Sequence, residues 1–285
     1  MGIIEKMNTI DPPEELFHYT TQDGLLGILK DDSLWVSSVI HLNDSSEYLL
    51  ALELAKQELN DRKNKTDGEE EKIDCLLNNI KTIQNSSVMV ASFTKKRDCL
   101  SQWNFYGKFN GGYSIGFNTN HLIQEANKQG YAIDKCFYEP NEQKQIIAKL
   151  INESLMEDFN IISEYVPENK PRTIVILATG GDFWKRLLYL APIIKNKAFN
   201  EEEEWRLISC MIKSSSGLCF RTGKSFLIPY YKFSLGPKKS YLSSITIGPT
   251  PNPDLARLSI ERLLTKYEVK QNVKIFNTEI PFRNW

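Results

Sequence analysis

Short runs of apolar, β-branched and aromatic residues recur along the chain between polar turns. Runs of four to eight such residues bounded by turn residues are typical of strands. By this pattern, strands are predicted over residues 16–20, 33–40, 88–94, 112–117, 205–208, 225–234, 244–248 and 273–276, with a further strand starting at 136–138. The chain is therefore expected to build a sheet from many short strands.

Apolar residues at helical spacing fill several of the intervals between these strands. A helix with a threonine cap is expected at 21–29, and Asp44 with Glu47 forms a capping-box pattern before a second helix. This second helix is expected at 47–62, and a third runs from the polar turn at 63–72 to about residue 85. Further helices are expected at 101–106, 141–167, 172–190 and 252–267. No internal repeat or low-complexity linker appears. We predict a single α+β domain over 1–285, with helical insertions near 47–85 and 141–190.

Composition narrows the class of protein. Hydrophobic residues make up 41% of the 285 residues and charged residues 25%, which is ordinary for a folded soluble chain and excludes collagen, coiled coil and wholesale disorder. No apolar run reaches about 18 residues, and the amino terminus is acidic, so neither membrane insertion nor export is expected. Five cysteines without a C-x-x-C pair indicate no disulfide framework and no structural zinc site. A cytoplasmic location fits these features.

The formal net charge is −1, but charge is unevenly distributed. Residues 1–80 contain 7 basic and 17 acidic side chains, whereas residues 221–285 contain 11 basic and 4 acidic ones. A basic carboxy-terminal quarter could meet the phosphates of a nucleic acid. It could equally be a solvated surface that complements the acidic front of the chain.

Only three histidines occur, so each is weighed as a candidate. His18 lies in an apolar strand between Phe17 and Tyr19, where its imidazole must be hydrogen-bonded in the core or face a cleft. His41 and His121 lie in turn-like contexts. No spacing of histidine, cysteine and carboxylate residues suggests a metal site, and no G-x-S-x-G elbow suggests a serine hydrolase.

Four glutamates, Glu201–Glu204, lead directly into the predicted strand 205–208. Alternation along an extended chain would place Glu202 and Glu204 on one face, with Arg206 on the same face. When two carboxylates lie side by side, the pKa of at least one of them rises unless a cation neutralises the pair. Such carboxylate pairs are found in functional sites. The other interpretation is a surface Arg206–Glu204 pair of little energetic value.

Aromatic residues mark a third candidate region. Trp103 and Tyr106 are three residues apart on a predicted short helix, and Tyr113 follows in the next strand. Such rings can form a wall on which a flat heteroaromatic group such as nicotinamide stacks. Packing in the core is the commoner role of such a pair.

Taken in order, these features resemble the bacterial DUF2971 family over nearly the whole chain. The motifs that carry the resemblance are Leu16-Phe17-His18-Tyr19-Thr20 with Gly24-Leu25, Leu34-Trp35, Leu42-Asn43-Asp44-x-x-Glu47, Ser92-Phe93, Trp103-x-x-Tyr106 with Gly112–Phe117, Glu202-x-Glu204-Trp205-Arg206-Leu207, Ile245-x-Ile247-Gly248-Pro249 and Ile280-Pro281-Phe282-Arg283. Each motif is short, but their shared order is specific.

That family in turn resembles the ADP-ribosyltransferase superfamily of the diphtheria-toxin and PARP type, whose signature is His, then Tyr, then Glu. These positions fall on His18, Tyr106 and Glu204, with Glu202 in the E-x-E form. Tyr19 follows His18 where the PARP type has glycine. The resemblance implies a split β-sandwich of mostly antiparallel strands with helical insertions.

The resemblance also implies roles for the residues. Glu204 would stabilise the oxocarbenium-like transition state at the ribose of NAD, and Glu202 would orient or activate the acceptor. His18 would donate a hydrogen bond to a ribose hydroxyl, and Tyr106 would stack on nicotinamide. The residues expected to contact NAD are His18, Tyr19, Thr20, Trp103, Tyr106, Tyr113 and Arg206. No metal is required.

The resulting hypothesis is an NAD-dependent ADP-ribosyltransferase that modifies a nucleic acid or a protein, of the kind found among toxins and phage-defence effectors. Such an enzyme could have an inhibitory partner protein. Two alternatives stay open: an NAD glycohydrolase that uses water as the acceptor, and a catalytically silent module that binds a nucleotide or a partner. The sequence does not name the acceptor, the oligomeric state or the role of Asn43, Asp44 and Glu47.

Overall fold

A computed structural model describes residues 12–42, 45–65, 68–83, 88–107, 111–156, 181–209, 216–269 and 272–281. Its strands are β1 (Glu15–Thr20), β2 (Ser33–Ser38), β3 (Met89–Thr94), β4 (Tyr113–Asn118), β5 (Tyr131–Lys135), β6 (Glu204–Ser209), β7 (Cys219–Thr222), β8 (Leu227–Ser234), β9 (Leu242–Ile247) and β10 (Lys274–Asn277). Every strand in this set joins one sheet.

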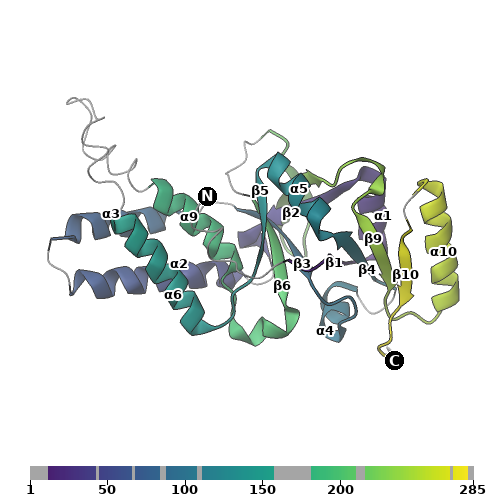
Figure 1. The fold of residues 1–285 in the computed structure, drawn as a ribbon, viewed down its shortest axis with the longest axis horizontal. Coiled ribbons are helices and arrows are strands. Elements are labelled where there is room, and N and C mark those ends of the chain that lie inside the picture. Colours follow the sequence, from purple (N-terminus) through teal and green to yellow (C-terminus); the bar gives the residue numbers. More distant parts are fainter. Residues whose placement is uncertain are drawn as a thin grey trace.

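Helices lie at both ends of this sheet and beside it. They are α1 (Gln22–Asp31), α2 (Ser45–Lys63), α3 (Glu70–Ile83), α4 (Leu100–Gln102), α5 (Thr119–Gln129), α6 (Pro140–Met156), α9 (Gly181–Leu190) and α10 (Pro253–Lys266). Short turns of 3₁₀ or π helix are η1 (Val39–His41), η2 (Trp103–Gly107), η3 (Ala191–Ile193), η4 (Lys197–Glu202) and η5 (Pro237–Lys239). Helices α2, α3, α6 and α9 gather at one end and α10 lies at the other (Figure 1).

The sheet splits beside β3. Its strand order is β10-β9-β4-β1-β3-β2-β8-β7, and β6 pairs with β3 and with β5. Along one edge, β3 pairs with β6 from Val90 to Thr94. Because a strand has only two edges, β1 and β2 must share the other one: β1 meets Thr94, and β2 meets Met89 and Val90. The two halves of the sheet therefore diverge from β3. Among the described pairs only β9 and β10 run parallel.

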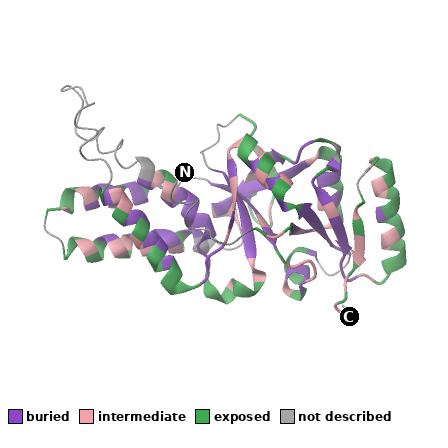
Figure 2. Cartoon of the chain, viewed as in Figure 1, coloured by how far each residue is buried: buried purple, intermediate pink, exposed green. Residues whose placement is uncertain are grey.

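The two faces of β3 and β6 are covered by two different cores. The sheet core includes Leu16, Leu34, Phe93, Ile115, Leu207 and Ile245, and the helical core includes Leu52, Ile80, Val90, Ile147, Leu187 and Ile208. Strand β6 is buried along its whole length, as Figure 2 shows, because its alternate side chains enter opposite cores. A charged side chain on β6 therefore needs a partner inside the protein.

The α+β class predicted from the sequence is confirmed, and most elements lie where the patterns placed them. Thr21 caps α1 through its side chain, and the helix predicted at 252–267 is α10. The capping box at Asp44 and residues 157–180 of the second helical insertion lie outside the described residues. Among the described helices, none combines the length and the apolar character that a membrane span requires.

Several predictions between residues 119 and 222 were incomplete or wrong. Strands β5 and β7 and helix α5 were not predicted, and His121 lies on α5 rather than in a turn. The strand start expected at 136–138 is a single parallel bridge from Phe137 to Ile194. Alternation is weak in β5 because each face packs against a different core, which hides the period that marks a half-exposed strand.

Candidate functional site

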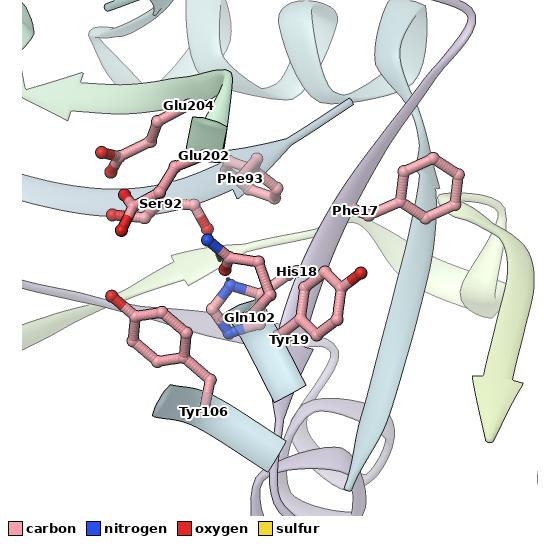
Figure 3. Close-up of a pocket in the computed structure, with 9 residues that line it drawn as sticks. All are labelled: Phe17, His18, Tyr19, Ser92, Phe93, Gln102, Tyr106, Glu202 and Glu204. Atoms are coloured by element: carbon pink, nitrogen blue, oxygen red, sulfur yellow. Dashed lines mark hydrogen bonds between the residues drawn. The ribbon is translucent and has the colours of Figure 1, made fainter. Parts of the chain in front are cut away.

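A pocket opens where β1 diverges from β3 (Figure 3). It is lined by Phe17, His18, Tyr19, Ser92, Phe93, Gln102, Tyr106, Glu202 and Glu204. These residues come from β1, β3, α4, η2, the end of η4 and the start of β6. Its cavity volume is about 40 Å³ and the pocket is partly open to solvent, so it encloses only a small part of a ligand.

His18 is fixed by the split in the sheet. Strand β1 is in register with β3 only at Phe17 and Thr94, and the His18 ring, rather than a backbone amide, bonds the Ser92 carbonyl at 2.9 Å from Nδ1. Burial lowers the pKa of His18 more than this hydrogen bond raises it, so the imidazole is neutral at pH 7.

The Ser92 bond also sets the tautomer. A carbonyl oxygen only accepts, so we assign the proton to Nδ1 of His18 and leave Nε2 as an acceptor. The sequence-based expectation that His18 donates a hydrogen bond to a ligand hydroxyl is therefore reversed. In this tautomer His18 Nε2 can only accept a hydrogen bond.

Glu204 lies at the first position of β6 and is held by two cations. Arg206 donates from Nε to Oε1 at 2.7 Å and from Nη2 to Oε2 at 3.0 Å, and Lys195 donates to Oε2 at 2.6 Å. Burial by itself would raise the pKa of Glu204, but Arg206 and Lys195 outweigh it and lower the pKa to about 2. A buried and permanently ionised carboxylate thus faces the pocket.

The pairing of the two glutamates differs from the sequence-based prediction. Glu202 ends the 3₁₀ turn η4 and Glu203 is left-handed, with φ of 43°, so alternation along a strand does not bring Glu202 beside Glu204. Lys195 joins them instead, because its ammonium bonds both carboxylates. Arg206 pairs with Glu204 as expected, but both side chains are only 5% exposed, so the surface-pair interpretation is wrong.

Lys195 was missed in the sequence. It is 2% exposed and directly follows the buried run Leu190–Ile194. A lysine at the end of an apolar run is a signal in itself, because a buried ammonium requires nearby carboxylates. The run Glu201–Glu204, a few residues later, supplies them.

Tyr106 stands at the mouth of the pocket, 41% exposed, with its hydroxyl directed toward the two glutamates (Figure 3). Partial burial, followed by the negative charges of Glu204 and Glu202, raises its pKa to about 12. The phenol is therefore neutral. Its ring contacts the Phe105 ring, with 6.5 Å between the centroids.

Close backbone contacts hold η2 in place. A Cβ atom on Gly112 would lie 2.4 Å from the Cα atom of Gly107, and one on Gly107 would lie 2.9 Å from the Trp103 ring. No side chain fits at either contact, so glycine at these positions lets η2 pack closely against the start of β4. Tyr106 is positioned by this packing.

Four residues expected to contact NAD do not line the pocket. Trp103 is completely buried, lies edge-on to Tyr19 at 4.5 Å between ring centroids and donates from Nε1 to Asp98 at 2.6 Å. Tyr113 packs in the sheet core, and the Thr20 hydroxyl lies against Gly24. Arg206 lies behind Glu204. These side chains support the pocket but do not form its surface, because the sheet and η2 close over them.

Of the residues that line the pocket, Tyr19 was predicted and several others were not. The Tyr19 hydroxyl donates to the Lys96 carbonyl at 2.9 Å, which fixes the position of its ring. Phe17, Phe93 and Gln102 were not expected. Gln102 lies directly before Trp103 and is 7% exposed. A polar residue directly before Trp103, which was predicted to contact a ligand, was a usable signal.

The described residues contain no group of three or more histidine, cysteine or acidic side chains arranged to hold a metal ion. Of the histidines outside the pocket, His121 bonds the Leu235 carbonyl at 2.7 Å and His41 bonds the Ser38 hydroxyl at 3.0 Å. Both have structural partners.

Residues 102–207 match the model of a family described as "Protein of unknown function (DUF2971)". The match includes Gln102, Tyr106, Glu202 and Glu204 and leaves out His18. No curated protein and no solved structure matches the chain. The match supports the DUF2971 resemblance seen in the sequence.

Proposed function

We propose that this protein is an NAD-dependent ADP-ribosyltransferase that modifies a macromolecular acceptor. The observation that carries the proposal is the convergence of His18, Tyr106 and Glu204, from three distant parts of the chain, on one pocket. A neutral imidazole, a neutral phenol and an ionised carboxylate suit the cationic nicotinamide end of NAD. The sheet that divides beside β3 also agrees with the split β-sandwich that the ADP-ribosyltransferase resemblance implies.

In the proposed reaction the bond between the ribose C1′ and the nicotinamide nitrogen breaks, and its electron pair leaves with nicotinamide. Positive charge builds on the ribose in the transition state, and the Glu204 carboxylate stabilises it. The nucleophile of the acceptor then bonds to C1′ and gives its proton to water. His18 Nε2 accepts a hydrogen bond from a ribose hydroxyl, and the Tyr106 ring covers nicotinamide.

The ion cluster supports the role of Glu204. A carboxylate that stabilises a cationic transition state must stay ionised and must not move when the charge appears. Arg206 and Lys195 meet both requirements, because they lower the pKa of Glu204 and bond both of its oxygens. Glu202, 14% exposed and also bound to Lys195, lies on the solvent side, where an acceptor would approach.

The test is release of nicotinamide from NAD by the purified protein, with a Glu204→Gln variant. The amide removes the negative charge at the ribose, so we expect the rate to fall by at least about 10²-fold. Glu201→Gln is the matched control, since it removes the same charge from an exposed side chain outside the pocket and should leave the rate unchanged.

Transfer is distinguished from hydrolysis by the fate of the label. NAD labelled in the adenylate part is incubated with cell extract, and the products are treated with nuclease or protease. Label retained on a macromolecule supports the transferase, and free ADP-ribose alone supports the glycohydrolase. If Glu204→Gln turns over NAD as fast as the wild type, the proposed site is wrong; a wild-type protein that consumes no NAD would leave only the binding-module hypothesis.

A further inference from the structure

Gln102 presents an amide to the pocket that the protein itself does not bond. The residue is 7% exposed and lines the pocket, with its amide directed into the space above His18 (Figure 3). Within the part of the chain that the structure describes, the Gln102 side chain makes no hydrogen bond. Its amide atoms are not sealed from solvent, so the amide is open to a ligand that enters the pocket.

The neighbouring polar groups show how unusual this is. His18 is bonded to Ser92, Tyr19 to Lys96, and Glu202 and Glu204 to Lys195. Each of these residues makes at least one hydrogen bond to another group of the protein. Gln102 alone among these neighbours presents both a free acceptor, Oε1, and a free donor, Nε2, to the pocket.

We propose that Gln102 is a specificity-determining residue that recognises the carboxamide of the nicotinamide ring. A carboxamide offers one acceptor and one NH₂ donor, the complement of the glutamine amide, so the two groups can form a pair of parallel hydrogen bonds. This inference rests on the proposed function and names the part of the substrate that the pocket reads.

The same geometry rejects a carboxylate at that position. A ligand carboxylate only accepts, so it would face Gln102 Oε1 with no hydrogen between the two oxygens. It would also enter a pocket already lined by Glu202 and Glu204. Specificity therefore has an attractive part and a repulsive part, and the pocket should prefer the amide form of the ring over the acid form.

The experiment compares nicotinamide with nicotinic acid, and NAD with its nicotinic acid counterpart, on the full-length protein. Binding is titrated by ligand-detected NMR, and turnover is measured separately. We expect the wild type to bind nicotinamide at least about tenfold more tightly than nicotinic acid. Gln102→Met, which keeps the length of the side chain and removes the amide, should abolish most of this preference.

Two controls separate recognition from folding. Asn104→Leu removes an exposed amide from the adjoining segment outside the pocket and should keep the preference. Gln102→Met should not lower the melting temperature of the unliganded protein, because the amide that it removes makes no hydrogen bond within the described protein. A marked loss of stability would indicate that Gln102 is structural and would overturn the proposal.

The remaining outcomes are also decisive. If Gln102→Met still prefers nicotinamide as strongly as the wild type, the inference about Gln102 is wrong, whether or not NAD is consumed. If the wild type binds neither nicotinamide nor NAD and releases no nicotinamide, the proposed function fails and the inference fails with it. NAD turnover without a preference in the wild type would overturn the inference alone.

Discussion

His18 and Glu204 face the same pocket, and their neighbours set opposite charge states. Burial lowers the pKa of His18 and keeps the ring neutral, whereas two cations lower the pKa of Glu204 and keep it charged. For His18 burial outweighs the opposing hydrogen bond to the Ser92 carbonyl, and for Glu204 the ion pairs with Arg206 and Lys195 outweigh burial. The reaction that we propose uses both states at once.

Tyr106 permits a test at this scale that separates its ring from its hydroxyl. We expect Tyr106→Ala to weaken NAD binding by about tenfold, because stacking of an aromatic ring on a base or nicotinamide contributes about 1–3 kcal/mol. Tyr106→Phe keeps the ring and should have a much smaller effect. Isothermal titration of both variants is the measurement, and equal losses would argue against stacking.

A single stretch of chain builds the charged wall of the pocket. From η3 to β6 it contributes Lys195, Glu202, Glu204 and Arg206, and the Arg206 guanidinium also donates to the Pro192 carbonyl. The 3₁₀ turn η4 and the left-handed Glu203 fold the stretch back so that Lys195 reaches both carboxylates. The cluster is internal, and removing one member leaves a buried charge without its partner.

Lys195→Met therefore tests the cluster at the scale of the element. We expect the free energy of unfolding to fall by about 3 kcal/mol, because Glu202 loses its cation and Glu204 keeps only Arg206. Adding Glu202→Gln should recover about 1 kcal/mol by removing one of the uncompensated charges. Urea unfolding of both variants provides the measurement.

Lys197→Met is the control for that experiment. Lys197 pairs with Glu139 on the surface, where the side chains are 61% and 54% exposed, and its loss should change stability by no more than about 0.5 kcal/mol. Equal effects of the two lysine substitutions would contradict a buried cluster.

At the scale of the whole molecule, the helical insertion is joined to the sheet by a buried polar contact as well as by the helical core. The Tyr189 hydroxyl of α9 donates to Asp134 of β5, and Asp134 lies opposite Arg206 in the β5–β6 ladder. Burial raises the pKa of Asp134 to about 6, although the bonds from Tyr189 and the Lys135 backbone oppose the shift. The insertion is thus attached next to the strand that carries Glu204.

The burial of Asp134 makes stability depend on pH. Asp134 ionises near pH 4 in the unfolded chain but only near pH 6 in the folded protein, so between these values the folded state binds more protons and its stability falls as pH rises. Asp134→Asn keeps an acceptor for Tyr189 and cannot ionise. We expect it to be about 2 kcal/mol more stable than wild type at pH 7.5 and nearly equal at pH 4.

Urea unfolding at the two pH values measures this difference. Asp61→Asn, at an exposed position on α2, is the matched control and should show no comparable dependence. A stabilisation by Asp134→Asn that is the same at both pH values would show that Asp134 is not the titrating group.

Local patterns determined the individual elements. The Thr21 cap of α1, the helical period and Pro253 start of α10, and the apolar and aromatic runs of β1 and β4 involve only a few neighbouring residues, so the sequence indicates them directly. The pairing of Glu204 with Arg206 was also accessible, because these residues are two apart on one strand. The resemblance to the ADP-ribosyltransferase signature likewise indicated His18, Tyr106 and Glu204 as candidates.

Tertiary structure alone decided which candidates share a pocket and in what charge state. His18 meets Ser92 74 residues away, and only the divergence of β1 from β3 makes that bond possible. The burial of Trp103, the free amide of Gln102 and the position of Lys195 between two glutamates depend on how distant segments pack. Burial and ion pairing are properties of three-dimensional neighbours, whereas capping and periodicity depend on neighbours along the chain.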